Sequence, residues 1–271
     1  MTDDDHLTEK AYKSETFIKS RHARPMRILA EYLHPESRFS ALKISDTIVF
    51  FGSARIRCEA DARVALDHVR RDGGDIKAAT KALEMSRYYE DCRELARRLT
   101  EWSKGLEEKR RRFVVCTGGG PGIMEAANRG ASEAKGLNIG LGISIPDEQY
   151  TNPYVTRNLA FEFHYFFMRK FWFVYLAKAL IAFPGGLGTL DEVFEVLTLI
   201  KTKKLRKRMP VLLYGSEYWR TVIDRRKLLE FGTVSKAEVD SLFEADDVDT
   251  AFQIITTELS AHALAKPGTT L

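Results

Sequence analysis

The chain has 271 residues, a length that fits one large domain or two small ones. Hydrophobic residues make up 44% of it, which is enough for a sizeable core, so the composition excludes a wholly disordered protein. Basic and acidic residues number 42 and 38, and this near balance does not by itself argue for a nucleic-acid partner.

Simple sequence signals exclude several other classes. The three cysteines lie far apart and form no CxxC pair, so neither a disulfide framework nor a zinc site is indicated. The six histidines show no ligand spacing, and no metal is expected. Residues 1–10 contain no apolar segment typical of a secretory signal, and no stretch approaches the ~18 apolar residues of a membrane span. We therefore expect a soluble cytoplasmic protein without membrane contact.

The first half of the chain is charged and mostly helical in pattern. Residues 1–43 are expected to form an N-terminal helical arm, with a break at His34-Pro35. The apolar run that starts at Thr47 and ends in Gly52-Ser53 predicts a buried strand followed by a turn. Residues 56–110 are expected to be helical with an interruption at 72–75, and the part near 56–86 is interpreted as a charged insertion.

Beyond residue 112, predicted strands and helices alternate. Strands are expected at 113–116, 139–145, 179–183 and 210–214. Helices are expected at 123–135, 161–178, 190–201, 218–231, 236–243 and 250–262, with a capping box from Ser235 to Glu238. The alternation predicts that residues 44–271 form an α/β domain, a doubly wound parallel sheet with helices on both faces. Ligands of such sheets bind outside the carboxyl ends of the strands, so the site is expected at 52–55, 117–122 and 184–192.

The third of these segments is a glycine-rich turn with the sequence Pro184-Gly-Gly-Leu-Gly-Thr-Leu-Asp-Glu192. Its glycines let the backbone approach a ligand closely. The unpaired N–H groups and the dipole of the following helix would bind an anion such as phosphate. Thr189 adds a hydroxyl donor, and Glu192 lies one turn into the helix. The alternative is a purely structural turn with Thr189 as the N-cap.

A second glycine-rich turn, Thr117-Gly-Gly-Gly-Pro-Gly-Ile-Met124, follows the strand predicted at 113–116. It has neither the GxGxxG spacing of a dinucleotide site nor the Gly-Lys-Ser/Thr of a Walker loop. Alone it is as readily structural as functional. Two such turns at one edge of a sheet favour a phosphate site, to which Gly52 and Ser53 would add a third, smaller contact.

Charged residues near these turns are further candidates. Arg169 stands within an aromatic segment, where its charge needs a carboxylate or a substrate phosphate as partner; the alternative is an interface or snorkelling arginine. The aromatic segment itself is expected to be core or a buried dimer contact. Glu148 either accepts hydrogen bonds from ribose hydroxyls or is a solvated acidic residue of a loop. The basic run 201–208 follows a predicted helix C-terminus, and we favour a solvated run there over an anionic partner.

Together these segments resemble the LOG ("Lonely Guy") family, nucleoside 5′-monophosphate phosphoribohydrolases that are often mislabelled as lysine decarboxylases. Residues 184–192 fit the family's PGGxGTxxE signature. Residues 117–128 resemble its first glycine-rich turn, and Phe166-Phe-Met-Arg-Lys170 is similar to its Arg-Lys segment. Gly52-Ser53, residues 145–149 and Asn152-Pro-Tyr154 match as well. The resemblance covers the chain from about Thr47 to the C-terminus, and residues 1–43 and 56–86 depart from the short family members.

The resemblance implies a Rossmann-like fold and hydrolysis of the N-glycosidic bond of AMP or an N6-modified AMP, such as a cytokinin riboside monophosphate. It implies that Arg169 and Glu192 are the catalytic pair, as in an AMP nucleosidase. The implied substrate contacts are Gly52, Ser53, Gly118, Gly119, Gly120, Glu148, Lys170, Gly185, Gly186, Gly188, Thr189 and Thr198. It also implies a homodimer or a higher homo-oligomer, and no cofactor.

Three other functions remain open at this stage. A lysine decarboxylase would need pyridoxal phosphate on a Schiff-base lysine, and no lysine here stands in a distinctive site. A nucleotide or cofactor carrier would share the fold but would not need the pair of Arg169 and Glu192. A regulatory role would use the basic run 201–208 to bind an anionic effector or a nucleic acid.

Overall fold

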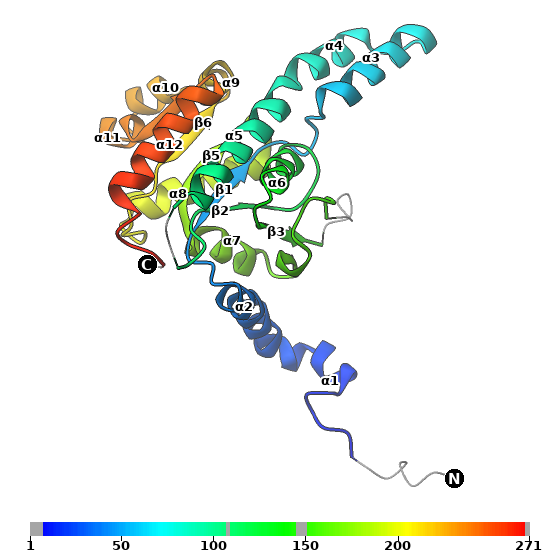
Figure 1. Cartoon of the computed structure of the whole chain (residues 1–271), viewed down its shortest axis with the longest axis vertical. Coiled ribbons are helices and arrows are strands. Elements are labelled where there is room, and N and C mark those ends of the chain that lie inside the picture. The colour runs from blue at the N-terminus through cyan, green and yellow to red at the C-terminus, as the bar shows by residue number, and fades with distance from the viewer. Residues whose placement is uncertain (1–7, 107–108, 145–150, 269–271) are drawn as a thin grey trace.

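The computed structural model describes residues 8–106, 109–144 and 151–268. Its centre is one sheet of seven parallel strands in the order β4-β3-β2-β1-β5-β6-β7 (Figure 1). The strands are β1 (Thr47–Phe51), β2 (Val114–Thr117), β3 (Asn138–Ile143), β4 (Ala160–Phe163), β5 (Ala177–Ala182), β6 (Val211–Tyr214) and β7 (Leu242–Ala245). This sheet confirms the predicted α/β fold.

Helices cover both faces of the sheet because the strands are apolar on both sides. In β1, Ile48 and Phe50 face one core, while Val49 and Phe51 face the other. The first core is closed by α5 (Arg87–Lys104), α6 (Ile123–Glu133) and α12 (Val248–His262). The second is closed by α2 (Arg24–Ala41), α7 (Phe166–Tyr175), α8 (Leu187–Lys201) and α9 (Ser216–Val222).

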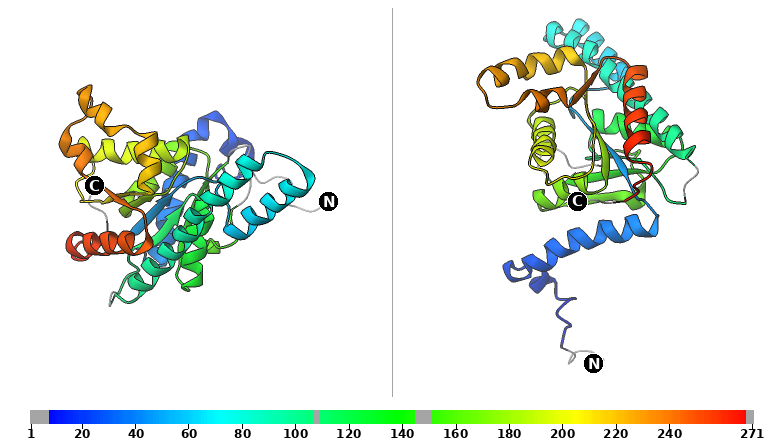
Figure 2. Two further views of the ribbon diagram at one scale, coloured as in Figure 1. Left: turned by 90° about the horizontal axis from the view of Figure 1, so that it is seen from above. Right: turned by 90° about the vertical axis from the view of Figure 1, so that its left-hand side faces the viewer.

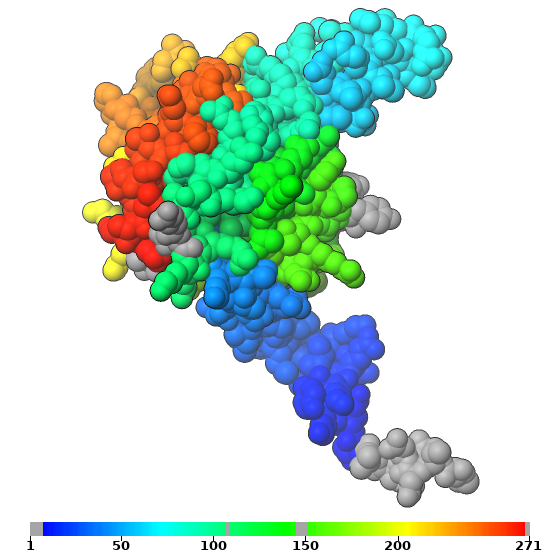
Figure 3. Space-filling view, viewed as in Figure 1, coloured from blue at the N-terminus to red at the C-terminus, as the bar shows by residue number. Residues whose placement is uncertain are grey.

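Two helical segments project from this body (Figures 1 and 3). One is α1 (Glu15–Lys19) with the first turns of α2, and the other is the hairpin of α3 (Glu59–Asp72) and α4 (Ile76–Met85). Figure 2 shows both from two further sides. The remaining short helices are η1 (Arg21–Ala23), η2 (Arg157–Leu159), α10 (Arg225–Glu230) and α11 (Lys236–Asp240). In the described part of the chain, every helix is too short or too polar to cross a membrane.

The predicted break at His34-Pro35 is wrong, because α2 runs through both residues. Proline in a helix leaves the carbonyl four residues earlier without its usual donor. Here that carbonyl belongs to Glu31, and it accepts a hydrogen bond from the indole Nε1 of Trp172 at 3.0 Å. Pro35 is itself buried, so packing against the body offsets the cost of the missing bond.

Three predicted helices are wrong in their extents. The segment 161–178 begins instead with β4, whose side chains alternate between exposed and buried, and it ends in β5. The segment 218–231 is divided into α9 and α10 at Ile223-Asp224. The segment 236–243 ends its helix at Asp240 and continues into β7. The predicted capping box of Ser235 and Glu238 is confirmed.

A buried ionic cluster lies at the amino-terminal edge of the sheet, opposite the predicted site. Asp46 forms an ion pair with Arg112, both side chains being fully buried, and lies 3.6 Å from Lys178 Nζ. Arg112 also donates to the carbonyls of Ala263 and Leu264, so the C-terminal segment is fixed to the same cluster. Burial raises the pKa of Asp46, while Arg112 opposes that shift.

Replacing Asp46 with Asn is therefore expected to destabilise the fold strongly. The change removes the carboxylate beside two buried cations, and breaking a buried pair in this way costs on the order of 3–5 kcal/mol. Urea denaturation measures the loss of unfolding free energy. As a control, Glu59→Gln removes an exposed pair with Arg63 and should cost less than about 1 kcal/mol. Equal losses in both variants would contradict the prediction.

Candidate functional site

The three predicted site segments meet at the carboxyl edge of the sheet. They follow β1, β2 and β5, which are adjacent at the point where the strand order reverses. Ser53 joins the other two turns through its backbone. Its N–H donates to the Pro184 carbonyl at 3.0 Å, and its carbonyl accepts from the N–H of Ile123 at 3.1 Å.

The turn after β5 is shaped by contact between Thr189 and Gly185. Helix α8 begins at Leu187 with Gly186 as its N-cap. Thr189 is buried, and a Cβ on Gly185 would lie 2.1 Å from its hydroxyl oxygen, so the turn needs glycine at 185. The first amides of a helix have no partner within the helix and carry the positive end of its dipole. The geometry therefore fits the binding of a phosphate at the start of α8.

The turn after β2 is held by buried polar side chains. Thr117 Oγ1 accepts from the N–H of Gly119 at 2.8 Å and donates to Asn128 Oδ1 at 2.7 Å. The side-chain amide of Asn152 donates to the carbonyls of Gly119 and Gly120, at 3.0 Å each. Sequence reasoning assigned no role to the two asparagines, although both lie in segments that carried the family resemblance.

Arg169 lies between this turn and β3. Its Nε donates to the carbonyl of Leu141 at 2.8 Å, and its guanidinium lies 5.1 Å from the ring centre of Phe173. A Cβ on Gly118 would be 2.7 Å from Arg169 Nη2, so the arginine occupies the space that a side chain at 118 would take. The structure thus places Arg169 of α7 against the glycine-rich turn that follows β2.

Glu192 is a buried carboxylate on α8, with its side chain 6% exposed. The ammonium of Lys170 lies 3.4 Å from Glu192 and also pairs with Asp191 at 2.7 Å and with Glu195 at 2.6 Å. Burial raises the pKa of Glu192 to about 7, against the attraction of Lys170 and Arg169. Burial lowers the pKa of Lys170, but its hydrogen bonds to Asp191 and Glu195 outweigh this and raise it. Lys170 is thus a firmly charged neighbour of a carboxylate that titrates near neutral pH.

Some of the other predicted substrate contacts lie in the glycine-rich turns, and others do not. Gly52 and Gly188 lie in the turns described above, whereas Glu148 falls outside the described residues. Thr198 lies on an exposed side of α8, well beyond the first turn, and its hydroxyl donates to the Phe194 carbonyl at 2.7 Å. Among the described residues, no group of three or more His, Cys, Asp or Glu side chains is placed to hold a metal ion.

The basic run 201–208 is not uniformly solvated, so that expectation is wrong for Lys207. Its ammonium is buried and donates to the carbonyls of Val174 and Tyr175, at 2.8 Å each. Burial lowers the pKa of Lys207 to about 7. Lys201 and Arg208 instead form ion pairs with Glu238 and Glu258.

Comparison with known proteins gives matches that overlap the site. Residues 124–255 match the family described as "Possible lysine decarboxylase". A protein of Rhodococcoides fascians named cytokinin riboside 5′-monophosphate phosphoribohydrolase is 32% identical over 113 residues. That alignment covers 41% of this chain and 55% of the relative, so the chain spans about half of the relative's length.

Two similar solved structures are a molybdenum cofactor binding protein from Rippkaea orientalis and the molybdenum cofactor carrier protein of Chlamydomonas reinhardtii. The first has a TM-score of 0.47 and 19% identity, over 79% of this chain and 96% of that one. The second has a TM-score of 0.48 and 19% identity, over 80% and 99%.

The fold and the site define a doubly wound α/β protein in which two glycine-rich turns meet a buried carboxylate. The sequence matches then confirm that the chain resembles the LOG family over the segments they cover, as the motifs predicted.

The raised pKa of Glu192 predicts a stability gain when this group is made non-ionisable. The pKa in the folded protein lies above the ordinary value of 4.5, so ionisation of Glu192 destabilises the fold as pH rises from about 4.5 through 7. Glu192→Gln should be more stable than the wild type at about pH 8, by on the order of 1–3 kcal/mol. The difference should disappear as the pH falls toward 4.5.

Urea denaturation across this pH range tests the prediction. The control is Glu59→Gln, which removes an exposed carboxylate of α3, outside the site, and should give no such gain. A Glu192→Gln variant that is less stable than the wild type at alkaline pH would contradict the expected burial cost.

Proposed function

We propose that this chain hydrolyses the N-glycosidic bond of a nucleoside 5′-monophosphate, releasing the free base and ribose 5-phosphate. The substrate class is AMP or an N6-modified AMP such as a cytokinin riboside monophosphate. One observation carries the proposal: the buried Glu192 carboxylate lies 3.4 Å from the Lys170 ammonium, with the charge of Arg169 also acting on it, near the start of a helix suited to phosphate. The name of the Rhodococcoides fascians relative supports the same substrate class.

The reaction needs a negatively charged group near the ribose and a binding site for the 5′-phosphate. As the bond from C1′ to the base nitrogen breaks, its electron pair leaves with the base and positive charge develops on the ribose. An ionised Glu192 stabilises that charge and orients the water whose oxygen bonds to C1′. One proton of this water passes to Glu192 and from there to the nitrogen of the departing base, which leaves Glu192 ionised again. A pKa of about 7 suits Glu192 to this exchange near neutral pH.

Phosphate binding supplies the alignment. The amides at the start of α8, with the Thr189 hydroxyl, would hold the 5′-phosphate away from the bond that breaks. Arg169 lies against Gly118 and would contact either the phosphate or Glu192. Contacts from Gly52, Ser53 and the turn 118–120 complete the proposed site; Glu148 and Thr198 remain contacts implied by the family resemblance.

Apolar side chains beside the site support a homo-oligomer as part of the proposal. Phe166 and Phe167 at the start of α7 are each 50% exposed, and Leu187 at the start of α8 is 86% exposed. Large apolar groups gathered near one site are typical of a surface that a partner covers. A second copy of the chain is the partner we propose.

The decarboxylase named by the family description receives no support from the lysines at the site. A Schiff-base lysine needs a lowered pKa so that its amine is free to attack a carbonyl. Lys170 is instead held by three carboxylates and its pKa is raised. Burial lowers the pKa of Lys178 and of Lys207, but both lie away from the glycine-rich turns. Lys178 pairs with Asp46 at the amino-terminal edge of the sheet, and Lys207 is bound by the carbonyls of Val174 and Tyr175, which precede β5. We therefore propose a hydrolase that needs no cofactor.

Glu192→Gln is expected to lower kcat for base release by about a hundredfold or more, because the variant cannot stabilise the ribose cation or accept a proton. The purified protein is incubated with AMP, GMP, CMP, UMP and isopentenyl-AMP, and free base is followed by chromatography. Arg169→Ala should also abolish most turnover. The affinity of this variant for ribose 5-phosphate should be measured as well. A weaker affinity would show that Arg169 contacts the phosphate, and an unchanged affinity would show that it acts on Glu192.

Thr202→Ala, at the far end of α8, is the matched control and should retain wild-type turnover. Substantial base release by Glu192→Gln would overturn the assigned role. Nucleotide binding without base release from any of the five substrates would favour a carrier over a hydrolase.

Lys170→Met is expected to move the acidic limb of the kcat–pH profile to higher pH by about one unit or more, because a nearby opposite charge lowers a carboxyl pKa. Without Lys170, the ionised form of Glu192 is less favoured. Glu195→Gln removes a like charge that raises the pKa of Glu192, so it should move the limb in the opposite direction. If Lys170 binds the substrate phosphate instead, KM will rise and the limb will stay in place.

A further inference from the structure

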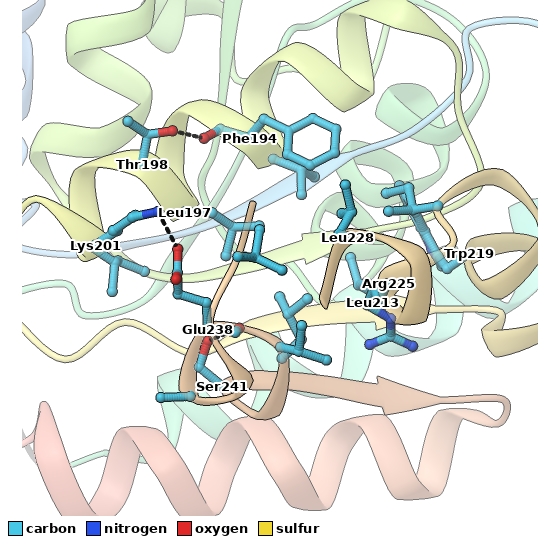
Figure 4. A pocket seen from close by; sticks show the side chains of 17 residues that line it. Phe194, Leu197, Thr198, Lys201, Leu213, Trp219, Arg225, Leu228, Glu238 and Ser241 are labelled. Atoms are coloured by element: carbon cyan, nitrogen blue, oxygen red, sulfur yellow. Dashed lines mark hydrogen bonds and ion pairs between the residues drawn. The ribbon is translucent and has the colours of Figure 1, made fainter. Parts of the chain in front are cut away.

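A cavity lies between α8, α9 and the short helices α10 and α11 (Figure 4), and of the substrate contacts implied by the family resemblance only Thr198 lines it. Its volume is about 350 Å³. Its walls are apolar side chains from four helices and two strands, including Leu197, Leu213, Trp219, Ile223, Leu228 and Val239. A volume of this order, with apolar walls, is within the range of small-molecule sites. Glu192 does not line the cavity, although its neighbour Val193 does.

The charged groups at the rim of the cavity are already paired within the chain. Lys201 Nζ lies 2.9 Å from Glu238 Oε1, a pair visible in Figure 4. Arg225 pairs with Glu244, and the hydroxyl of Ser241 donates to the Glu238 carbonyl at 2.7 Å. A charged ligand would therefore have to break an internal pair or be buried without a partner, which is costly. An uncharged apolar ligand meets neither cost.

Helix α9 connects this cavity with the glycine-rich turn of the proposed site. Trp219 lines the cavity, and its indole Nε1 donates to the carbonyls of Tyr214 and Ala182, at 3.0 and 3.2 Å. The adjacent Tyr218 donates its hydroxyl to the Gly185 carbonyl at 2.6 Å. Two neighbouring side chains thus fix the end of β5 and the turn that follows it. A ligand that presses on Trp219 acts directly on the helix that holds this turn.

We propose that the cavity is a binding site for a small, uncharged, apolar molecule, and that its occupation is transmitted through Tyr218 to the turn at Gly185. A ligand that fills the space beside Trp219 fixes α9, and this keeps the bond from Tyr218 to Gly185 formed. The amides at the start of α8 are then held ready for a phosphate, so the ligand should tighten nucleotide binding. The coupling to nucleotide binding rests on the proposed function, whereas the binding site in the cavity does not.

Binding is tested with N-phenyl-naphthylamine, an uncharged fluorescent probe, on the full chain. Anilinonaphthalene sulfonate has the same rings with an added charge and should bind at least about tenfold more weakly, a loss of roughly 1.4 kcal/mol. Ala237→Phe and Val234→Phe place a ring in the cavity from two different segments, and each should weaken the uncharged probe by about tenfold or more. Phe231→Ala removes a 75% exposed ring that does not line the cavity and should change nothing.

The site is overturned if the filled variants, folded as judged by circular dichroism, bind the uncharged probe as tightly as the wild type. It is also overturned if the charged probe binds equally well. Probe affinity that falls as protein concentration rises would show that a second copy of the chain fills the cavity, and would likewise overturn the proposal.

Coupling is tested by measuring AMP affinity with and without the uncharged probe. Saturating probe should tighten AMP by about fivefold or more, and AMP should tighten the probe by the same factor. Tyr218→Phe should retain probe binding and lose the coupling. Equal AMP affinity in both conditions would overturn the coupling while the cavity site stands. Failure of AMP to bind at all would contradict the proposed function and the coupling with it, while the probe titrations would still decide the cavity site.

Discussion

The proposed site depends on two places where the backbone passes so close to a side chain that only glycine fits. At Gly118 the space beyond Cα is taken by the guanidinium of Arg169, and at Gly185 it is taken by the hydroxyl of Thr189. The first contact brings α7 to the turn after β2, and the second folds the turn after β5 onto the start of α8. Each glycine therefore leaves room for one side chain of the proposed site. A methyl group at either place would displace the charged or polar group before it disturbed the sheet.

The burial of Glu192 lowers the stability of the fold but suits the proposed reaction. Glu192 is buried where its ionised form is unfavourable, and Lys170 recovers part of that cost. The lysine is bound by two further carboxylates, so it is fixed in place and remains charged. On balance, burial raises the pKa of Glu192 to about 7, a value that suits the proton exchange of the proposed reaction. A protein that used this helix only as a scaffold would gain stability from an uncharged residue at 192.

Much of the fold was predictable because strong local patterns coincide with buried elements. The apolar run of β1, the two glycine-rich turns and the amphipathic helix α5 each have a pattern that packing reinforces. The edge strands β4 and β7 were missed because they are short and only partly buried. Their own alternation was too weak to show, and the predicted helices next to them were extended over them. The bond from Tyr218 to Gly185 joins residues 33 positions apart and has no local signature. Arg169 and Glu192 were predicted from the aromatic segment and the glycine-rich turn that contain them, and the family resemblance implied their roles. The three carboxylates around Lys170 required the structure.

The continuous helix α2 changes how the N-terminal segment is understood. In this helix the backbone carbonyl of Glu31 accepts a hydrogen bond from the indole N–H of Trp172. The Glu31 carboxylate accepts hydrogen bonds from the backbone N–H groups of His164 and Tyr165, which precede α7. The carboxylate thus fixes the two residues that lead into α7, the helix that carries Arg169 and Lys170. A chain that started at residue 44 would retain every motif of the site, yet it would leave an indole donor and two amides at α7 without these partners. The segment before the sheet therefore supports α7 and with it the positions of Arg169 and Lys170 in the proposed site.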